Sequence, residues 1–275
     1  MSNIVFCGIA PHPPLLVPEV GGERIAKVNE SQRALREFSS RVLATRPAAI
    51  VVISPHSPYD PRVFTARYSK RLAGDFRQFG VAKVALSFEN DLEMIDALEQ
   101  AAELEGAAFR AITRDYPLDH GALVPLYYLR EAGWDGPVVV IAFTDQSIQT
   151  HLAFGRAIRR AADALGRRIA VVASGDLSHR LIEDGPYEFE PTAHLFDEQV
   201  VSAIARGDAQ AVVDVDPDLR ERAGECGYRS ILIALGSVDC TLPDKQVLSY
   251  EGPFGVGYMV AVLACDPAAS RANSP

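Results

Sequence analysis

The chain has 275 residues, of which 48% are hydrophobic and 23% are charged, and its formal net charge at pH 7 is −9. This composition is typical of a folded domain with a substantial apolar core, and the acidic balance argues against nucleic acid or an anionic membrane surface as the main partner. No apolar run reaches the roughly 18 to 20 residues that a membrane span requires. The four cysteines are widely spaced and form no CxxC motif, so we expect a cytoplasmic protein.

The predicted elements alternate between strands and helices along the whole chain. In chain order, the first half predicts a strand at residues 4–10, a helix at 22–45, strands at 48–53, 62–68 and 81–88, and helices at 91–104 and 120–131. The second half predicts a strand at 137–143, a helix at 150–165, a strand at 168–174, helices at 193–205 and 225–235, and strands at 247–250 and 258–263. Asn90 is the expected N-cap of the helix at 91–104.

This alternation predicts one α/β domain with a central, mixed and mostly buried sheet that is flanked by helices. Continuous apolar runs such as residues 48–53 are typical of strands buried on both faces. We expect the domain to cover residues 1–265 and the small, polar residues 266–275 to form a flexible tail. The glycine-rich GPFGVG at residues 252–257 lies between the last two predicted strands, which favours a bulged hairpin over a phosphate-binding loop.

Two histidines follow buried strands and lie between prolines. His12 lies in PHPP and His56 in SPHSP, each directly after an apolar run. Ligand sites in open α/β sheets lie beyond the carboxyl ends of the strands, and proline restricts the backbone around each histidine. A metal ligand needs such a fixed backbone, so we expect His12 and His56 to bind one metal ion.

A third ligand is available from the segment AGECGYRS, where Glu225 and Cys226 are adjacent. A carboxylate favours iron(II) with open coordination positions, whereas a thiolate favours zinc or a closed site. Adjacent residues at a helix start point in different directions, so we expect one of the two to ligate. The structural alternatives are a first-turn glutamate that interacts with the helix dipole and a small core cysteine.

The remaining histidines fall into two groups. His120 begins a predicted helix in LDHG, and SGDLSH places Asp176 and His179 directly after a strand. Asp176 is suited to orient a neighbouring imidazole or to cap the next segment, and His179 to accept or donate a proton near neutral pH. His151 and His194 lie within or beside predicted helices, where we expect a core or surface role.

Five motifs occur in one order over nearly the whole chain: PHPP, SPHS, LDHG, GDLSH and ECGYRS. Together they resemble the class III extradiol ring-cleavage dioxygenases of the protocatechuate 4,5-dioxygenase catalytic-subunit type. The resemblance implies Fe²⁺ held by His12, His56 and Glu225, with His179 as the acid–base catalyst and His120 in the pocket for oxygen and substrate. It also implies that a small aromatic diol and O₂ are the substrates and that the ring opens beside the two hydroxyl groups.

The same motifs resemble the Memo-like branch of this superfamily, which includes AmmeMemoRadiSam system protein B. That branch carries a cysteine near the glutamate position, where Cys226 falls, but the ECGYRS pattern looks more like the glutamate-bearing members, and we favour Glu225. A Memo-like protein without ring-cleavage activity, working with an AMMECR1-like or radical SAM partner, is the main alternative. A zinc hydrolase that uses the same pocket is the third hypothesis. The alternatives to Fe²⁺ are therefore Zn²⁺ or no metal. Buried strands and an acidic surface are also compatible with a homo-oligomer.

Overall fold

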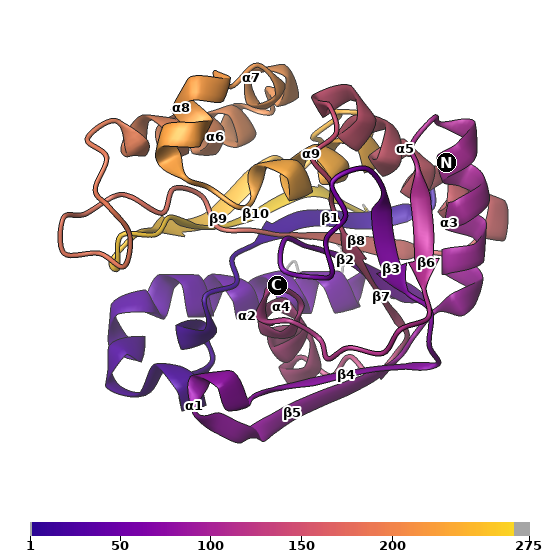
Figure 1. Cartoon of the computed structure of the whole chain (residues 1–275), viewed down its shortest axis with the longest axis horizontal. Helices are drawn as coiled ribbons and strands as arrows, with labels where there is room; N and C mark the ends of the chain where they lie inside the picture. The colour runs from indigo at the N-terminus through magenta and orange to yellow at the C-terminus, as the bar shows by residue number, and fades with distance from the viewer. Residues whose placement is uncertain (1, 267–275) are drawn as a thin grey trace, which may run out of the picture.

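An eight-stranded mixed sheet forms the centre of the computed structural model, which describes residues 2–266 (Figure 1). Its strands lie in the order β6 (Phe109–Ile112), β3 (Phe64–Arg67), β7 (Val138–Ala142), β2 (Ala49–Ser54), β8 (Ile169–Ser174), β1 (Ile4–Ala10), β10 (Tyr258–Cys265) and β9 (Gln246–Glu251). The four central strands β7, β2, β8 and β1 run parallel, whereas β3 pairs antiparallel with β7 and β10 with β1. The predicted single α/β domain with a mixed central sheet is confirmed.

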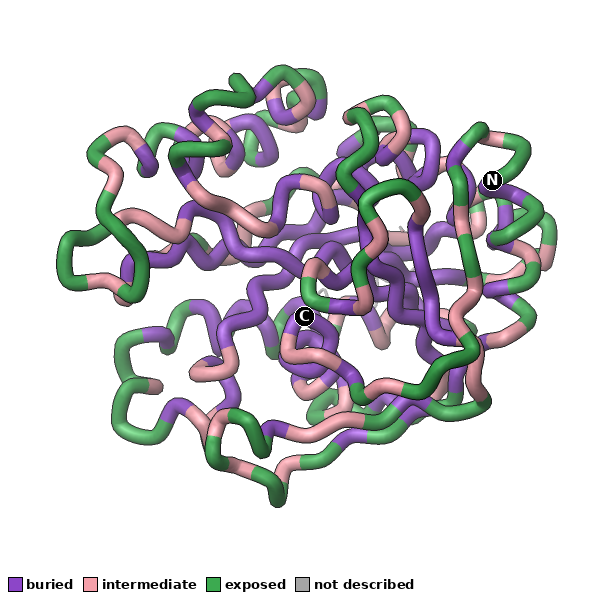
Figure 2. The backbone as a smooth tube through the Cα atoms, viewed as in Figure 1, coloured by how far each residue is buried: buried purple, intermediate pink, exposed green. Residues whose placement is uncertain are grey.

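Helices cover both faces of this sheet, which explains why the central strands are apolar without interruption. Alternate residues of β2 enter two different cores: Val51 and Ile53 face one, and Ile50 and Val52 face the other. The first core is completed by α3 (Leu92–Leu104), α5 (Ile148–Leu165), α6 (Ala193–Arg206) and α9 (Tyr228–Ser237). The second is completed by α2 (Asn29–Ala44) and α4 (His120–Glu131). Figure 2 shows the resulting buried centre beneath exposed loops and outer helix faces.

The segment between β2 and α4 carries two strands that the sequence did not predict. One is β4 (Arg71–Phe76), which pairs antiparallel with β5 (Val81–Glu89) in a separate two-stranded sheet along the lower edge of Figure 1. The other is the four-residue β6, which pairs with β3 at the edge of the main sheet. Both are edge strands with exposed polar residues, so neither has the continuous apolar run of a central strand.

Several predicted helix boundaries differ from the structure, and the starts expected at residues 22 and 225 differ most. The helix expected from residue 22 begins as a 3-10 helix (Gly22–Val28), and α2 starts at Asn29 because Val28 departs from helical geometry (φ −126°, ψ 28°). Asp91 rather than Asn90 caps α3, since its carboxylate accepts the Met94 N–H. The helix expected from residue 225 begins at Tyr228.

Short helices complete the described chain: a 3-10 helix at Pro14–Leu16, α1 (Pro18–Gly21), a 3-10 helix at Arg77–Phe79, α7 (Ala209–Val213) and α8 (Pro217–Ala223). The glycine-rich segment 252–257 connects the antiparallel strands β9 and β10, as the hairpin interpretation predicts. Within residues 2–266, no helix is both long and apolar enough to cross a membrane. The predicted flexible tail lies outside the described residues apart from Asp266.

Candidate metal centre

The carboxyl ends of β1, β8 and β2 bring three predicted site residues together. These strands are neighbours in the sheet and run parallel, and they lead into His12, Asp176 and His56 respectively. The Nε2 atoms of His12 and His56 lie 3.0 Å apart. The structure thus brings His12 and His56 together, and their binding of one metal ion stays a prediction.

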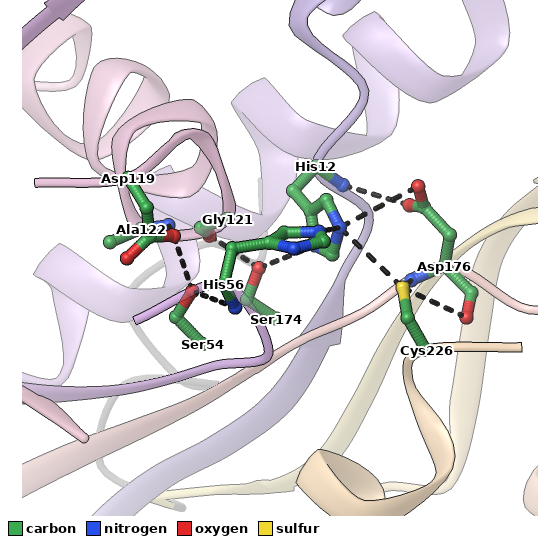
Figure 3. A network of polar contacts seen from close by, with 9 residues as sticks. All are labelled: His12, Ser54, His56, Asp119, Gly121, Ala122, Ser174, Asp176 and Cys226. Carbon is green, nitrogen blue, oxygen red and sulfur yellow. Dashed lines mark hydrogen bonds and ion pairs between the residues drawn. The ribbon is translucent and has the colours of Figure 1, made fainter. Parts of the chain in front are cut away.

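Ligand atoms from five residues converge around His12 (Figure 3 shows four of them). Within residues 2–266, His12, His56 and His120 form one group whose ligand atoms lie within 4.8 Å of one another, and His12, Asp176 and Cys226 form a second. From His12 Nε2, the Cys226 Sγ lies at 3.6 Å and the Asp176 Oδ2 at 3.7 Å. Ligand atoms held by one transition-metal ion at about 2.0 to 2.3 Å lie roughly 3 to 4 Å from one another, and the distances from His12 Nε2 to the nearest donor atoms fall in this range.

Burial keeps the histidine pKa values low. It lowers the pKa of His12 well below the ordinary value, and His56 and His120 lower it further by charge repulsion. It also lowers the pKa of His56, against the opposing effect of Asp119. Burial and the neighbouring His56 lower the pKa of His120 to about 4. Neutral imidazoles carry the lone pair that a metal ion binds.

Burial raises the pKa values of the acidic groups in the cluster. Burial raises the pKa of Asp176 to about 7 and that of the Cys226 thiol well above its ordinary value. A bound metal ion would favour the ionised forms of both groups. Asp176 is also fixed in position, because its Oδ1 accepts the backbone N–H of His12 at 3.0 Å.

Glu225 belongs to neither group of convergent ligand atoms within the described residues. One carboxylate oxygen accepts the N–H of Tyr228 at 2.6 Å, at the start of α9, and the other lies 3.9 Å from Arg220 Nε. Burial raises the pKa of this carboxyl to about 6 although both contacts oppose the rise. Cys226 thus faces His12. Glu225 instead contacts the start of α9, in agreement with the structural alternative of a first-turn glutamate that interacts with the helix dipole.

His179 lines a cavity of about 520 Å³ together with His12, His56, His120 and Asp176. Its Nε2 is buried and has no hydrogen-bond partner among the described residues, and burial lowers its pKa to about 4. Its ring stacks on Tyr187, with centroids 4.9 Å apart and planes at 19°. The other walls are mostly apolar or aromatic and include Pro13, Pro14, Leu15, Ile182, Phe254, Val256 and Tyr258.

Sequence reasoning missed Tyr187 and Phe254, the aromatic residue of the β9–β10 connection. Tyr187 lies in an irregular loop, where no periodic pattern marks a residue for the site. The hairpin interpretation predicted Phe254 only as a turn residue and not as part of the site. By contrast, His151 and His194 lie where they were expected: His151 is buried, with its Nδ1 2.8 Å from the Ser147 carbonyl and its Nε2 3.2 Å from the Thr144 carbonyl, and His194 is exposed.

The fold and the site define an α/β protein with a cluster of histidine, aspartate and cysteine at the carboxyl edge of its sheet. A sequence model of the family described as the catalytic LigB subunit of aromatic ring-opening dioxygenase matches residues 7–261, and the chain belongs to this family. The resemblance carried by the five motifs is confirmed. The family is metal-dependent, in agreement with the donor cluster around His12.

Two curated relatives and one solved structure add to this assignment. Protein CA_C1420 of Clostridium acetobutylicum is 31% identical over 263 residues, which cover 93% of this chain and 56% of that protein. MEMO1 family protein PAE0818 of Pyrobaculum aerophilum is 24% identical over 163 residues, 57% of this chain and 56% of that protein, which supports the Memo-like branch. The alignments thus span about half the length of these relatives. The crystal structure of uncharacterized protein JW3007 from Escherichia coli K12 shares the fold, with a TM-score of 0.57 and 20% identity over 82% of this chain and 90% of that chain.

Proposed function

We propose that the chain binds one divalent transition-metal ion, Fe²⁺, through His12 and His56 and cleaves an aromatic diol by extradiol oxygenation with O₂. The 3.0 Å separation of the two Nε2 atoms, at the wall of a cavity with aromatic sides, carries this proposal. When bound, the metal would supply adjacent positions for the diol and O₂ and a path for electron density between them. The LigB family assignment supports the same reaction class.

The side chains around the cavity have distinct roles in this proposal. His179, whose Nε2 has no partner among the described residues, accepts a proton from a substrate hydroxyl and returns it to the product. His120 donates a hydrogen bond to negative charge that develops on oxygen. The aromatic ring of the substrate packs between the apolar walls near Phe254 and Tyr258.

The position of Cys226 favours a second candidate function. Its sulfur lies 3.6 Å from His12 Nε2, whereas the Glu225 carboxylate contacts Tyr228 and Arg220. A ligand set of His12, Asp176 and Cys226, whose ligand atoms lie within 4.8 Å of one another, would suit a Memo-like metal-binding protein without ring cleavage, and the MEMO1 family relative supports this reading. An AMMECR1-like or radical SAM protein is then the proposed partner.

Metal content separates the two candidates. The protein is purified without oxygen and loaded with Fe²⁺ or Zn²⁺, and bound metal is measured in the wild type, Glu225→Gln and Cys226→Ser. Glu225→Gln keeps an oxygen that can accept the Tyr228 N–H, and His194→Ala is the matched control because His194 is an exposed histidine outside the cavity. Oxygen uptake with catechols is measured in parallel.

Each outcome has a definite meaning. Loss of iron only in Glu225→Gln, together with catechol-dependent oxygen uptake, supports the dioxygenase with Glu225 as the third ligand. Loss only in Cys226→Ser without oxygen uptake supports the Memo-like alternative. A wild-type protein that binds neither metal, or variants that all retain it, overturns the proposed ligand set.

A further inference from the structure

A proline inside α4 leaves one backbone carbonyl without its helical partner. In an α-helix the carbonyl of Gly121 would accept the N–H of residue 125, but that residue is Pro125, which has no N–H. The hydroxyl of Ser174, at the end of β8, donates to the Gly121 carbonyl instead. Ser174 is fully buried, so this bond meets the need of a buried acceptor.

This bond uses the only proton that the Ser174 hydroxyl has. A carbonyl cannot donate, so the hydroxyl hydrogen must point toward Gly121. The Nδ1 atom of His12 lies 3.0 Å from the same Ser174 oxygen. Since the oxygen has only lone pairs left to offer, His12 must carry its proton on Nδ1.

The opposite nitrogen of His12 then has a free lone pair. Nε2 is the atom that faces His56 at 3.0 Å, Cys226 at 3.6 Å and Asp176 at 3.7 Å (Figure 3). Metal-bound histidines commonly donate their other ring N–H to a fixed acceptor, which sets the tautomer and the ring orientation. We infer that Ser174 is a positioning residue that sets the His12 tautomer and presents Nε2 to the metal.

Close packing fixes the carbonyl that holds Ser174. A Cβ atom on Gly121 would lie 2.4 Å from the Ser54 oxygen and 3.2 Å from His56 Cδ2, so only glycine fits between α4 and the His56 loop. Ser54 in turn donates to Asp119, the N-cap of α4. The motifs around both histidines are therefore joined through the start of α4. The effect of Ser174 on metal binding rests on the proposed metal site.

Ring-nitrogen NMR of the metal-free protein tests the tautomer directly. Spectra of ¹⁵N-labelled wild type are expected to show His12 protonated on Nδ1, and Ser174→Ala is expected to shift population toward the Nε2–H form. Ser174→Thr retains the hydroxyl and is expected to restore the wild-type tautomer. Ser39→Ala is the matched control, because Ser39 is also buried and its hydroxyl has no partner among the described residues.

Zn²⁺ affinity, measured by competition with a chelator, supplies the functional readout. Ser174→Ala is expected to weaken binding by about 10- to 100-fold, and Ser174→Thr to remain within about threefold of wild type. An unchanged tautomer in Ser174→Ala, or equal losses in the alanine and threonine variants, would overturn the inference. If the wild type binds no Zn²⁺ or Fe²⁺, the proposed function fails, while the spectra still decide whether Ser174 sets the tautomer.

Discussion

The loops that carry His12 and His56 are alike in sequence but are held in different ways. The His12 ring is buried and makes polar contacts through both nitrogens, to Ser174 and toward the cluster, and its backbone N–H binds Asp176. His56 is exposed, and the polar contact of its ring within the described residues is to His12. Flanking prolines thus predict a fixed backbone at both positions, whereas the fixed ring orientation of His12 comes from residues distant in sequence.

This difference predicts unequal consequences when each histidine is removed, and these are the largest expected effects. In His12→Ala, both groups of convergent ligand atoms lose their shared member, so we expect metal affinity to fall more than 100-fold. In His56→Ala, Asp176 and Cys226 still lie near His12 Nε2, and we expect a loss of about 10-fold. Titration with Zn²⁺ by calorimetry measures both, and an equal loss would show that the two loops contribute alike.

A second difference lies between Asp197, which contacts the segment after β8, and Asp119, which contacts the His56 loop. Asp197 is buried behind the segment that follows β8, where it accepts the Ser178 N–H at 2.8 Å and the Tyr250 hydroxyl at 2.6 Å. Burial raises its pKa to about 6 although these hydrogen bonds act in the opposite direction. Asp119, at the His56 loop, is only half-buried.

The raised pKa of Asp197 predicts a pH dependence of stability. Between about pH 4 and 6 the folded state holds a proton on this group that the unfolded chain has lost, so its contribution to stability decreases as pH rises through this window. Asp197→Asn removes this titration. From pH 4 to pH 7, the free energy of unfolding of the wild type should therefore fall by roughly 2 kcal/mol relative to that of the variant. Urea denaturation at several pH values measures this shift, and a difference that does not change with pH contradicts the prediction.

The sequence predicted the histidine positions better than the orientation of neighbouring residues. Apolar runs that end in His12 and His56 place both residues at one sheet edge, because parallel neighbouring strands end together. The choice between Glu225 and Cys226 depends on where α8 ends and α9 begins. Gly224 ends α8 in a left-handed conformation (φ 65°), and the Cys226 and Gly227 amides face the Asp176 carbonyl at 3.4 and 2.9 Å, a contact across the fold that periodicity does not encode.

The same limit applies to the elements that the sequence missed. Edge strands such as β4 and short helices such as α8 have few buried residues, so their local pattern is weak. The contact of Ser174 with Gly121 was also not predicted, although Pro125 within a helical pattern is a readable signal that the carbonyl four residues earlier needs another donor.

The smallest expected effect concerns the cap that holds the His56 loop. Asp119 accepts hydrogen bonds from Ser54 and Ser57, on either side of His56, and from the Ala122 N–H of α4. Asp119→Ala removes all three contacts, and we expect a loss of about 1 to 2 kcal/mol in the free energy of unfolding.

Ser147→Ala is the matched control for this variant. Ser147 also caps a helix, since its hydroxyl accepts the Thr150 N–H at the start of α5, but it does not line the 520 Å³ cavity. Both variants should lose stability in urea denaturation, but only Asp119→Ala should also weaken Zn²⁺ binding, by several-fold. If the two variants bind Zn²⁺ equally well, Asp119 acts only as a helix cap. The prolines beside His56 would then be sufficient to hold its loop, and the difference between the two histidine loops would lie entirely on the His12 side.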